Sequence, residues 1–360
     1  MPKLGKYMLS VSAILLLAVL VLLIFDHKQY LGIVLILFFA TLAMGVRSHR
    51  FLKGFSFTIL IFAAVVASLF YPQWFTRIGG FDLKNLIVPL LMIIMFGMGT
   101  SMSLKDFYGV IKMPKGVLVG IVCQFSIMPF VGYGLAYISG FPPEIAAGII
   151  LVGCSPSGLA SNVMAYISGA NLALSLTLTA VATLLAPLLT PFMMKLLADQ
   201  LVPIDFLGML WSIFKIVILP IILGLAFNRF AHGRFPWLDK AMPIISMAGI
   251  TLIITIITAA GRDSLLTIGL ALILVVLVHN MCGYLFGYWG SRLVGLDKKS
   301  ARTIAFEVGM QNAGLASGIA LEMGRVATMG LAPAVFGPFM NITGSSLATW
   351  WRAKFEEKQE

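Results

Sequence analysis

One acidic residue of this 360-residue chain stands apart from the others. Thirteen of the 14 Asp and Glu residues fall in loops, tails or the ends of apolar stretches, whereas Glu307 lies within an apolar stretch. A carboxylate inside a membrane is destabilising unless it is paired or bound to a cation, so it is a functional candidate by default. One interpretation is an ion pair with Lys215, the one basic residue within an apolar stretch.

A bound metal ion is the other interpretation. A hard monovalent ion such as sodium takes about five or six oxygen ligands, by analogy with the harder divalent ions. Ser175 and Thr179 are four residues apart, so on a helix both hydroxyls lie on the same face. The side chains that could supply oxygens near Glu307 are Ser161, Asn162, Ser175, Thr179, Gln311 and Asn312.

Composition places these residues in a membrane. Hydrophobic residues make up 60% of the chain and charged residues 11%, and the mean hydropathy is +1.00. A soluble protein carries roughly a quarter of charged residues to cover its surface. We therefore interpret the chain as an all-α polytopic membrane protein whose surroundings are the lipid bilayer. The net charge of +11 does not indicate nucleic-acid binding, because the basic residues lie in short gaps between apolar runs.

Apolar runs of about 20 residues predict twelve membrane spans. With the N-terminus inside, the inside segments hold 18 Lys and Arg residues and the outside loops six. This bias predicts a cell (inner) membrane protein with both termini cytoplasmic. No small-x-small cleavage site follows Phe25, so the first run is interpreted as a retained helix. The expected spans are 8–25, 30–46, 55–71, 86–103, 116–139, 145–168, 171–197, 206–228, 241–260, 264–292, 300–323 and 327–351.

The chain contains an internal repeat. The segment 153–161 (GCSPSGLAS) is similar to 309–317 (GMQNAGLAS), which lies 156 residues later. The segment 185–192 is likewise similar to 331–339. The copies lie five spans apart, and an odd offset predicts two inverted five-helix repeats, as in alternating-access transporters. The expected parts are an added N-terminal helix pair (1–50), the two repeats (51–200 and 201–354) and a cytoplasmic tail (355–360).

Both copies place Gly, Pro, Ser and amide residues in mid-membrane. Such residues weaken a helix, so we expect discontinuous helices that are broken near Ser155–Gly158 and near Gly309–Gly314 and that cross each other. Lipid cannot satisfy the backbone groups that a break frees, so they must line a cavity or hold a ligand. Packing of small residues would explain the glycines but not the amides.

These motifs resemble a known family. The segments 153–162 (GCSPSGLASN) and 307–312 (EVGMQN) are similar to the two crossover motifs of the bile acid:sodium symporter family. Residues 95–99, 124–129, 279–280 and 341–346 support the resemblance, which runs from about Phe55 to Lys354 and leaves out the N-terminal pair. It implies sodium-coupled symport of an organic anion, either bile-acid-like or a small carboxylate such as pantoate or a keto acid, with a panel domain and a core domain.

The resemblance also implies where the ligands bind. It places one co-transported sodium ion at Ser161, Asn162, Ser175, Thr179 and Glu307. It places a second at Gln124, Glu307 and Gln311 with the carbonyls of Val308 and Met310. Asn312 and Asn341 match residues of the substrate cavity, whereas Leu159 and Met340 replace threonine and histidine of relatives with less polar side chains.

Two other classes of function remain open. A sodium/proton antiporter of the inverted-repeat type usually has a mid-membrane aspartate pair, which this chain lacks, although proton coupling through Glu307 is possible. An intramembrane enzyme would need a catalytic motif, and the sequence has no H-E-x-x-H or G-x-S-x-G. We therefore expect a transporter and not an enzyme. A sensor on this scaffold would have lost ion ligands or gained a domain.

Overall fold

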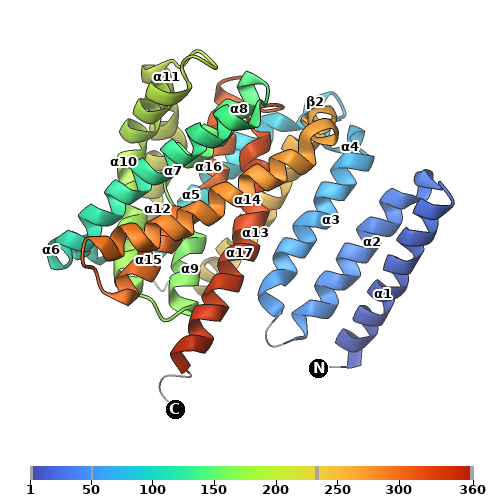
Figure 1. The fold of residues 1–360 in the computed structure, drawn as a ribbon, viewed down its shortest axis with the longest axis horizontal. Helices are drawn as coiled ribbons and strands as arrows, with labels where there is room; N and C mark the ends of the chain where they lie inside the picture. The colour runs from blue at the N-terminus through green and yellow to red at the C-terminus, as the bar shows by residue number, and fades with distance from the viewer. Residues whose placement is uncertain (1–2, 50–51, 232–234, 357–360) are drawn as a thin grey trace.

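The computed structural model describes residues 3–49, 52–231 and 235–356, nearly all of them helical (Figure 1). In chain order the elements are α1 (Lys3–Ile24), α2 (Lys28–Arg47), η1 (Lys53–Phe55), α3 (Ser56–Phe70), α4 (Gln73–Thr76), β1 (Arg77–Ile78), β2 (Phe81–Asp82), η2 (Leu83–Leu86), α5 (Ile87–Ser101), η3 (Leu104–Tyr108), α6 (Gly109–Lys112), α7 (Pro114–Ser139), α8 (Pro143–Cys154), α9 (Leu159–Ile167), α10 (Leu172–Ala198), α11 (Phe206–Ile213), the π-helical η4 (Phe214–Ile218), α12 (Leu219–Ala231), α13 (Pro236–Ala260), α14 (Arg262–Leu293), α15 (Lys298–Gly309), α16 (Ala313–Glu322) and α17 (Leu331–Glu356).

Nine helices within the described ranges are long and apolar enough to cross a membrane. The chain is therefore a multi-pass helical membrane protein, as its composition predicts. The two strands form a small hairpin between α4 and α5, which the sequence reasoning did not expect. Its turn residues Gly79 and Gly80 have φ values of +54° and +86°, which glycine adopts without strain.

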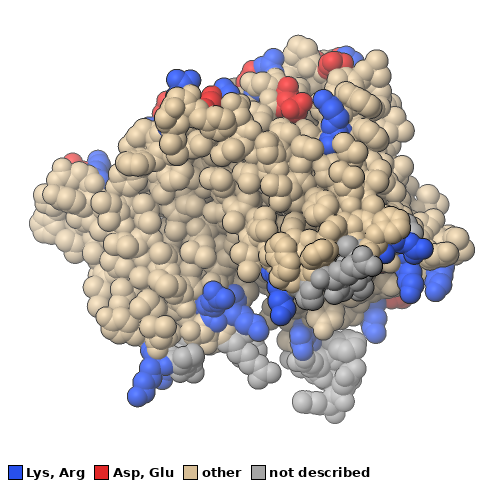
Figure 2. Space-filling model, turned by 180° about the vertical axis from the view of Figure 1, so that it is seen from behind, with Lys and Arg blue, Asp and Glu red and all other residues tan. Residues whose placement is uncertain are grey.

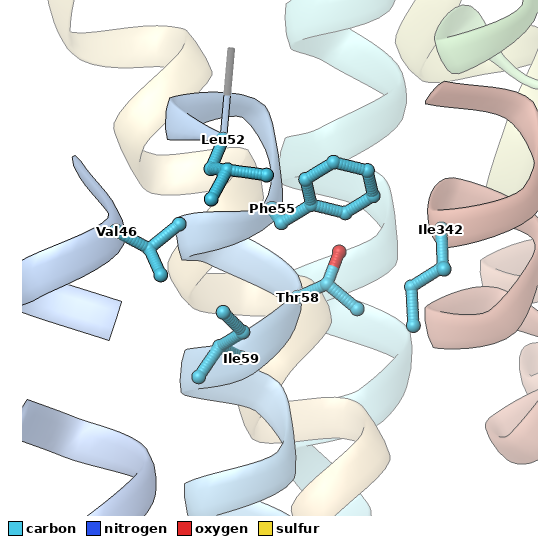
Figure 3. A pocket seen from close by; sticks show the side chains of 6 residues that line it. All are labelled: Val46, Leu52, Phe55, Thr58, Ile59 and Ile342. Carbon is cyan, nitrogen blue, oxygen red and sulfur yellow. The ribbon is translucent and has the colours of Figure 1, made fainter. Parts of the chain in front are cut away.

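The first three helices lie side by side along one edge of the molecule, where α2 packs between α1 and α3 (Figure 1). Close approach depends on glycine: a Cβ atom on Gly45 would lie 2.8 Å from the side chain of Leu9. Figure 3 shows a small cavity at the end of α2, where Val46 of α2 and Ile342 of α17 approach α3 from opposite sides.

The remaining helices form the main body. Helix α5 packs closely on α12, and α13 lies against both α3 and α5. A Cβ on Gly99 would lie 2.3 Å from the carbonyl oxygen of Ile221, so small residues bring α5 and α12 together, as is common in membranes. On the other side, α14 packs against α7, α15 and α17. In Figure 1, α1 begins and α17 ends at the lower end of the molecule.

On the face shown in Figure 2, charged residues lie mostly at the two ends of the helices. Figure 2 shows Lys and Arg gathered along the lower edge and a mixture of acidic and basic residues along the upper edge. The band between the edges carries few charges. This distribution fits a protein that exposes an uncharged belt to the hydrocarbon core of a bilayer.

Candidate ion-binding site

Two of the predicted spans are interrupted, and each forms a pair of short helices. Helix α8 ends at Cys154 and α9 begins at Leu159. Pro156 explains this break, since it has no N–H and disfavours helical geometry at Ser155, whose ψ is 152°. The second break separates α15, which ends at Gly309, from α16, which begins at Ala313.

The second break has another local cause, because it contains no proline. Met310 is extended, with φ −108° and ψ 93°. The Asn312 side chain then accepts a hydrogen bond from the Leu315 N–H at 3.0 Å and caps α16, which is the usual role of asparagine at a helix start. Gly309 is required where α15 passes α14, since a Cβ atom would lie 2.2 Å from the ring of Tyr284.

The two breaks cross and pair with each other. Ser157 and Gln311 form an isolated antiparallel bridge. The Gly158 N–H donates to the Met310 carbonyl at 3.2 Å, and the Asn312 N–H donates to the Pro156 carbonyl at 2.8 Å. Each interruption therefore satisfies backbone groups that the other exposes, as the absence of water inside a membrane demands.

Side chains from neighbouring helices hold three further carbonyls at the breaks. Gln124 of α7 donates to the Ser155 carbonyl at 2.9 Å, and Thr190 of α10 donates to that of Cys154 at 2.7 Å. At the second break, Asn280 of α14 donates to the Gly309 carbonyl at 2.8 Å. Thr190 and Asn280 were not among the predicted site residues, although both lie in polar interruptions of apolar runs.

Glu307 lies one turn before the second break and is 2% exposed. Four hydroxyls surround its carboxylate. Ser161 and Ser175 lie 2.7 and 2.6 Å from Oε1, and Ser157 and Thr179 lie 2.5 and 2.9 Å from Oε2. The carboxylate therefore receives hydroxyl groups from the first break, from α9 and from α10.

The alternative interpretation, an ion pair between Glu307 and Lys215, is wrong. Lys215 lies in the π-helical segment η4 with its side chain exposed, and no ion pair joins it to Glu307 within the described ranges. The Lys215 side chain lies on the surface of the helical bundle, and a long lysine chain there can carry its ammonium toward the membrane interface. The buried carboxylate is thus left with hydroxyl partners only.

Three of these hydroxyls each face two acceptors. The Ser175 Oγ lies 2.7 Å from the Oδ1 of Asn162 as well as 2.6 Å from Glu307, and the Thr179 Oγ1 lies 3.2 and 2.9 Å from the same pair. Ser161 lies 2.7 Å from both the Gly158 carbonyl and the carboxylate. A hydroxyl has one proton to donate. Each of the three therefore has one close oxygen–oxygen contact that its proton cannot satisfy.

This donor set fits a hard cation. It consists of carboxylate, hydroxyl and amide oxygens, which suit a hard cation and not a soft transition metal. No cluster of three His, Cys, Asp or Glu side chains occurs in the part of the chain that the structure describes. A cation among these oxygens would supply the positive charge that Glu307 lacks and would satisfy the unmatched oxygen contacts.

A second group of amides lies beside the first. Gln124 donates from Nε2 to the Oε1 of Gln311 at 2.8 Å, and Gln311 donates from Nε2 to the Val308 carbonyl at 2.5 Å. The Oε1 of Gln124 is buried without a hydrogen-bond partner. The Met310 carbonyl accepts from Gly158, so it belongs to the pairing of the two breaks. The structure brings these residues together but joins neither glutamine to Glu307 by a hydrogen bond.

The four residues predicted to line a substrate cavity lie on neighbouring helices. Leu159 begins α9 and is partly exposed, whereas Asn312 caps α16 and is 8% exposed. Met340 and Asn341 lie on α17, which packs against both α9 and α16. No hydrogen bond between their side chains is present in the structure.

Ser157 is the nearby hydroxyl that sequence reasoning missed. Its Oγ donates to Glu307, and the residue is 1% exposed. The signal was available: it lies in the first repeat motif at the position that Ala313 occupies in the second. The first break therefore has a hydroxyl group at this position, and the second break has a methyl group.

Comparison with known proteins bears on this arrangement. The model of the Sodium Bile acid symporter family matches residues 88–268. A Bacillus subtilis protein named "Uncharacterized sodium-dependent transporter YocS" is 38% identical over 315 residues, which cover 87% of this chain and 96% of that protein. The chain belongs to the sodium bile acid symporter family.

More distant members are also similar. "Probable sodium/metabolite cotransporter BASS1, chloroplastic" of Arabidopsis thaliana is 33% identical over 305 residues, covering 85% of this chain and 75% of that protein. The rice protein "Probable sodium/metabolite cotransporter BASS2, chloroplastic" is 33% identical over 301 residues, covering 82% and 70%. These relationships confirm the predicted family and the prediction of a sodium-dependent transporter and not an enzyme.

Proposed function

We propose that this protein is a sodium-coupled symporter that takes up an organic anion by alternating access. The observation that carries the proposal is the buried Glu307 carboxylate without a basic partner, around which three hydroxyls each face two acceptors. The names of its relatives support sodium coupling, and "metabolite" in the plant names supports a small organic substrate.

The first sodium ion binds between α9, α10 and α15. Its ligands are Ser161, Asn162, Ser175, Thr179 and Glu307, whose oxygens already lie within 3.2 Å of one another in the pairs described above. A second sodium ion binds near Gln124 and Gln311 with the carbonyls of Val308 and Met310. The unpartnered Oε1 of Gln124 supports this assignment. Binding there requires the two glutamine amides to turn from each other.

The substrate binds beside the crossing point. Helices α9 and α16 begin there, and the free N–H groups at a helix start favour an anion once sodium has neutralised Glu307. Asn312 and Asn341 contact the anion through hydrogen bonds, while Leu159 and Met340 contribute apolar surface. Bile-acid-like anions and small carboxylates such as pantoate or keto acids have this chemistry.

The protein crosses the membrane twelve times. Nine of the crossings are made by the long apolar helices. Two more are made by the interrupted pairs α8–α9 and α15–α16, and the last by the 26-residue α17. Residues 51–200 and 201–354 form inverted repeats behind the added pair 1–50, and transport moves a panel of helices against a core. The basic edge in Figure 2 supports a cytoplasmic position for both termini and the tail 355–360 in the cell membrane.

Thermal unfolding of the purified protein in sodium and in potassium tests the ion site. A ligand that binds only the folded state stabilises it by about 2.7 kcal/mol at a concentration one hundred times its Kd. We expect sodium to raise the unfolding temperature of the wild type and to have no such effect on Glu307→Gln. Glu322→Gln, which changes an exposed carboxylate that accepts a hydrogen bond from Ser212, is the matched control and keeps the response.

A wild type that unfolds at the same temperature in both salts would contradict sodium coupling. Proton coupling through Glu307 would then be the better proposal, and substrate uptake would follow a pH gradient in place of a sodium gradient. Sodium stabilisation that survives in Glu307→Gln would place the ion elsewhere. Once the response is established, added carboxylates that raise the unfolding temperature further, in sodium only, identify the substrate class.

A further inference from the structure

A groove separates α3 from α13, away from the crossing point. Its volume is about 700 Å³, which lies within the range of roughly 300–1,000 Å³ for sites that bind small molecules. Phe57, Leu60 and Ala64 line it from one face of α3, and Ile244 and Ala248 are among the α13 residues on the opposite wall. Thr58 and Ile59 point the other way, into the cavity of Figure 3.

The walls of the groove are mainly apolar. Its three hydroxyl groups already donate to helix carbonyls: Ser56 to Ala43 at 2.9 Å, Thr251 to Met247 at 2.8 Å, and Thr255 to Thr251 at 2.7 Å. A polar ligand would find no free donor along these walls. A hydrocarbon chain has the chemistry that matches them.

Two cations lie at one end of the groove. Arg47 is the last residue of α2, and Lys53 is the first residue of η1. Both line the groove, both are exposed, and neither joins an ion pair with any of the described residues. An acidic group bound at this end would meet two positive charges, whereas the cavity of Figure 3 has no charged side chain.

We propose that this groove binds an anionic phospholipid. The lipid phosphate lies between Arg47 and Lys53, and one acyl chain lies between Leu60 of α3 and Ala248 of α13. Basic pockets between spans are the usual binding sites of acidic lipid headgroups. Arg47 belongs to the added helix pair, so the pair completes the headgroup site and joins the lipid to α3 and α13.

A soluble amphipathic anion has the same two features as the lipid, a negative head and an apolar body. The lipid is favoured because Arg47 and Lys53 adjoin apolar walls between helices of a membrane protein, which is the setting in which basic pockets bind acidic lipid headgroups. The proposed sodium ligands lie on α7, α9, α10 and α15 and at the second break, whereas the groove is lined by residues of α2, η1, α3, α4 and α13. Lipid binding there is therefore separable from the sodium response.

Native mass spectrometry of the delipidated full chain tests the proposal, with phosphatidylglycerol and phosphatidylcholine of identical acyl chains in competition. We expect the wild type to prefer phosphatidylglycerol on the order of tenfold, since each basic residue attracts an acidic lipid. The double variant Arg47→Gln/Lys53→Gln loses the preference. Lys112→Gln/Lys115→Gln, an equal charge change at exposed residues of α6 and α7, keeps it.

Two further arms distinguish a lipid from a free anion. Ala248→Phe fills the groove from an exposed position and reduces phosphatidylglycerol binding, whereas a hundredfold excess of inorganic phosphate does not displace the lipid. Equal binding of both lipids by the wild type would overturn the proposal. So would a preference that survives in Arg47→Gln/Lys53→Gln, an equally large loss in Lys112→Gln/Lys115→Gln, full binding by Ala248→Phe, or displacement by phosphate.

Discussion

Ser157 and Ser175 both contact Glu307, but the structure predicts different consequences when each loses its hydroxyl. The Ser157 Oγ lies 2.5 Å from the carboxylate and has no second acceptor, so it acts as a donor. The Ser175 Oγ lies 2.6 Å from the carboxylate and 2.7 Å from Asn162 Oδ1, so it lies among oxygens that suit a cation. Ser157→Ala therefore removes a hydrogen bond, and Ser175→Ala removes a sodium ligand.

The magnitudes follow from these contacts. A buried hydrogen bond to a charged group contributes about 1.5–3 kcal/mol, so Ser157→Ala should lower the free energy of unfolding by that amount in sodium and in potassium alike. The sodium increment remains, at about 2.7 kcal/mol for a concentration one hundred times Kd. If Ser175→Ala raises Kd a hundredfold, the same sodium concentration gives an increment of about 0.4 kcal/mol.

Unfolding of the wild type and both variants in matched sodium and potassium series measures the two effects separately. Ala313 occupies the position of Ser157 in the second motif, which indicates that alanine is compatible with this backbone. A Ser157→Ala protein that no longer responds to sodium would make Ser157 a ligand and refute the distinction. A full response in Ser175→Ala would refute the ion site itself.

Three other substitutions test contacts at the first break, at the start of α8 and at the start of α15. Gln124→Leu leaves the buried Ser155 carbonyl without its donor and should lower stability by about 1–3 kcal/mol in potassium, where no sodium ligand is lost; an unchanged unfolding temperature in potassium would contradict this role. Glu144→Gln breaks the ion pair with Arg325, which is about one-third exposed, so we expect a loss below about 1 kcal/mol that shrinks in high salt; a large, salt-independent loss would contradict it. Burial opposes ionisation of Asp297, but hydrogen bonds from the side chain and N–H of Ser300 and the N–H of Lys299 lower its pKa below the usual value. Its stabilisation is therefore complete above about pH 4 and is lost as the pH falls further, and unfolding of Asp297→Asn between pH 3 and 7 should lack this dependence.

The apolar pattern predicts the membrane class because it depends only on composition and length. It is less informative where a span is interrupted: 145–168 and 300–323 each fold as two short helices. Pro156 predicts the first break from the sequence, since it acts on its own backbone. The second break depends more on its surroundings, because Gly309 must pass the ring of Tyr284, which lies on another helix.

Residue types alone identified Glu307 and the oxygens of Ser161, Ser175 and Thr179, because a lone acid in an apolar run needs compensation wherever the chain folds. Their sodium binding remains a prediction. Tertiary structure decided which partners they meet. Lys215 is as close to the middle of a span as Glu307, but its side chain lies on the surface of the bundle, whereas Glu307 is buried. Ser157 contacts the carboxylate because the two breaks cross, and no spacing along the chain determines how two segments 150 residues apart will pair.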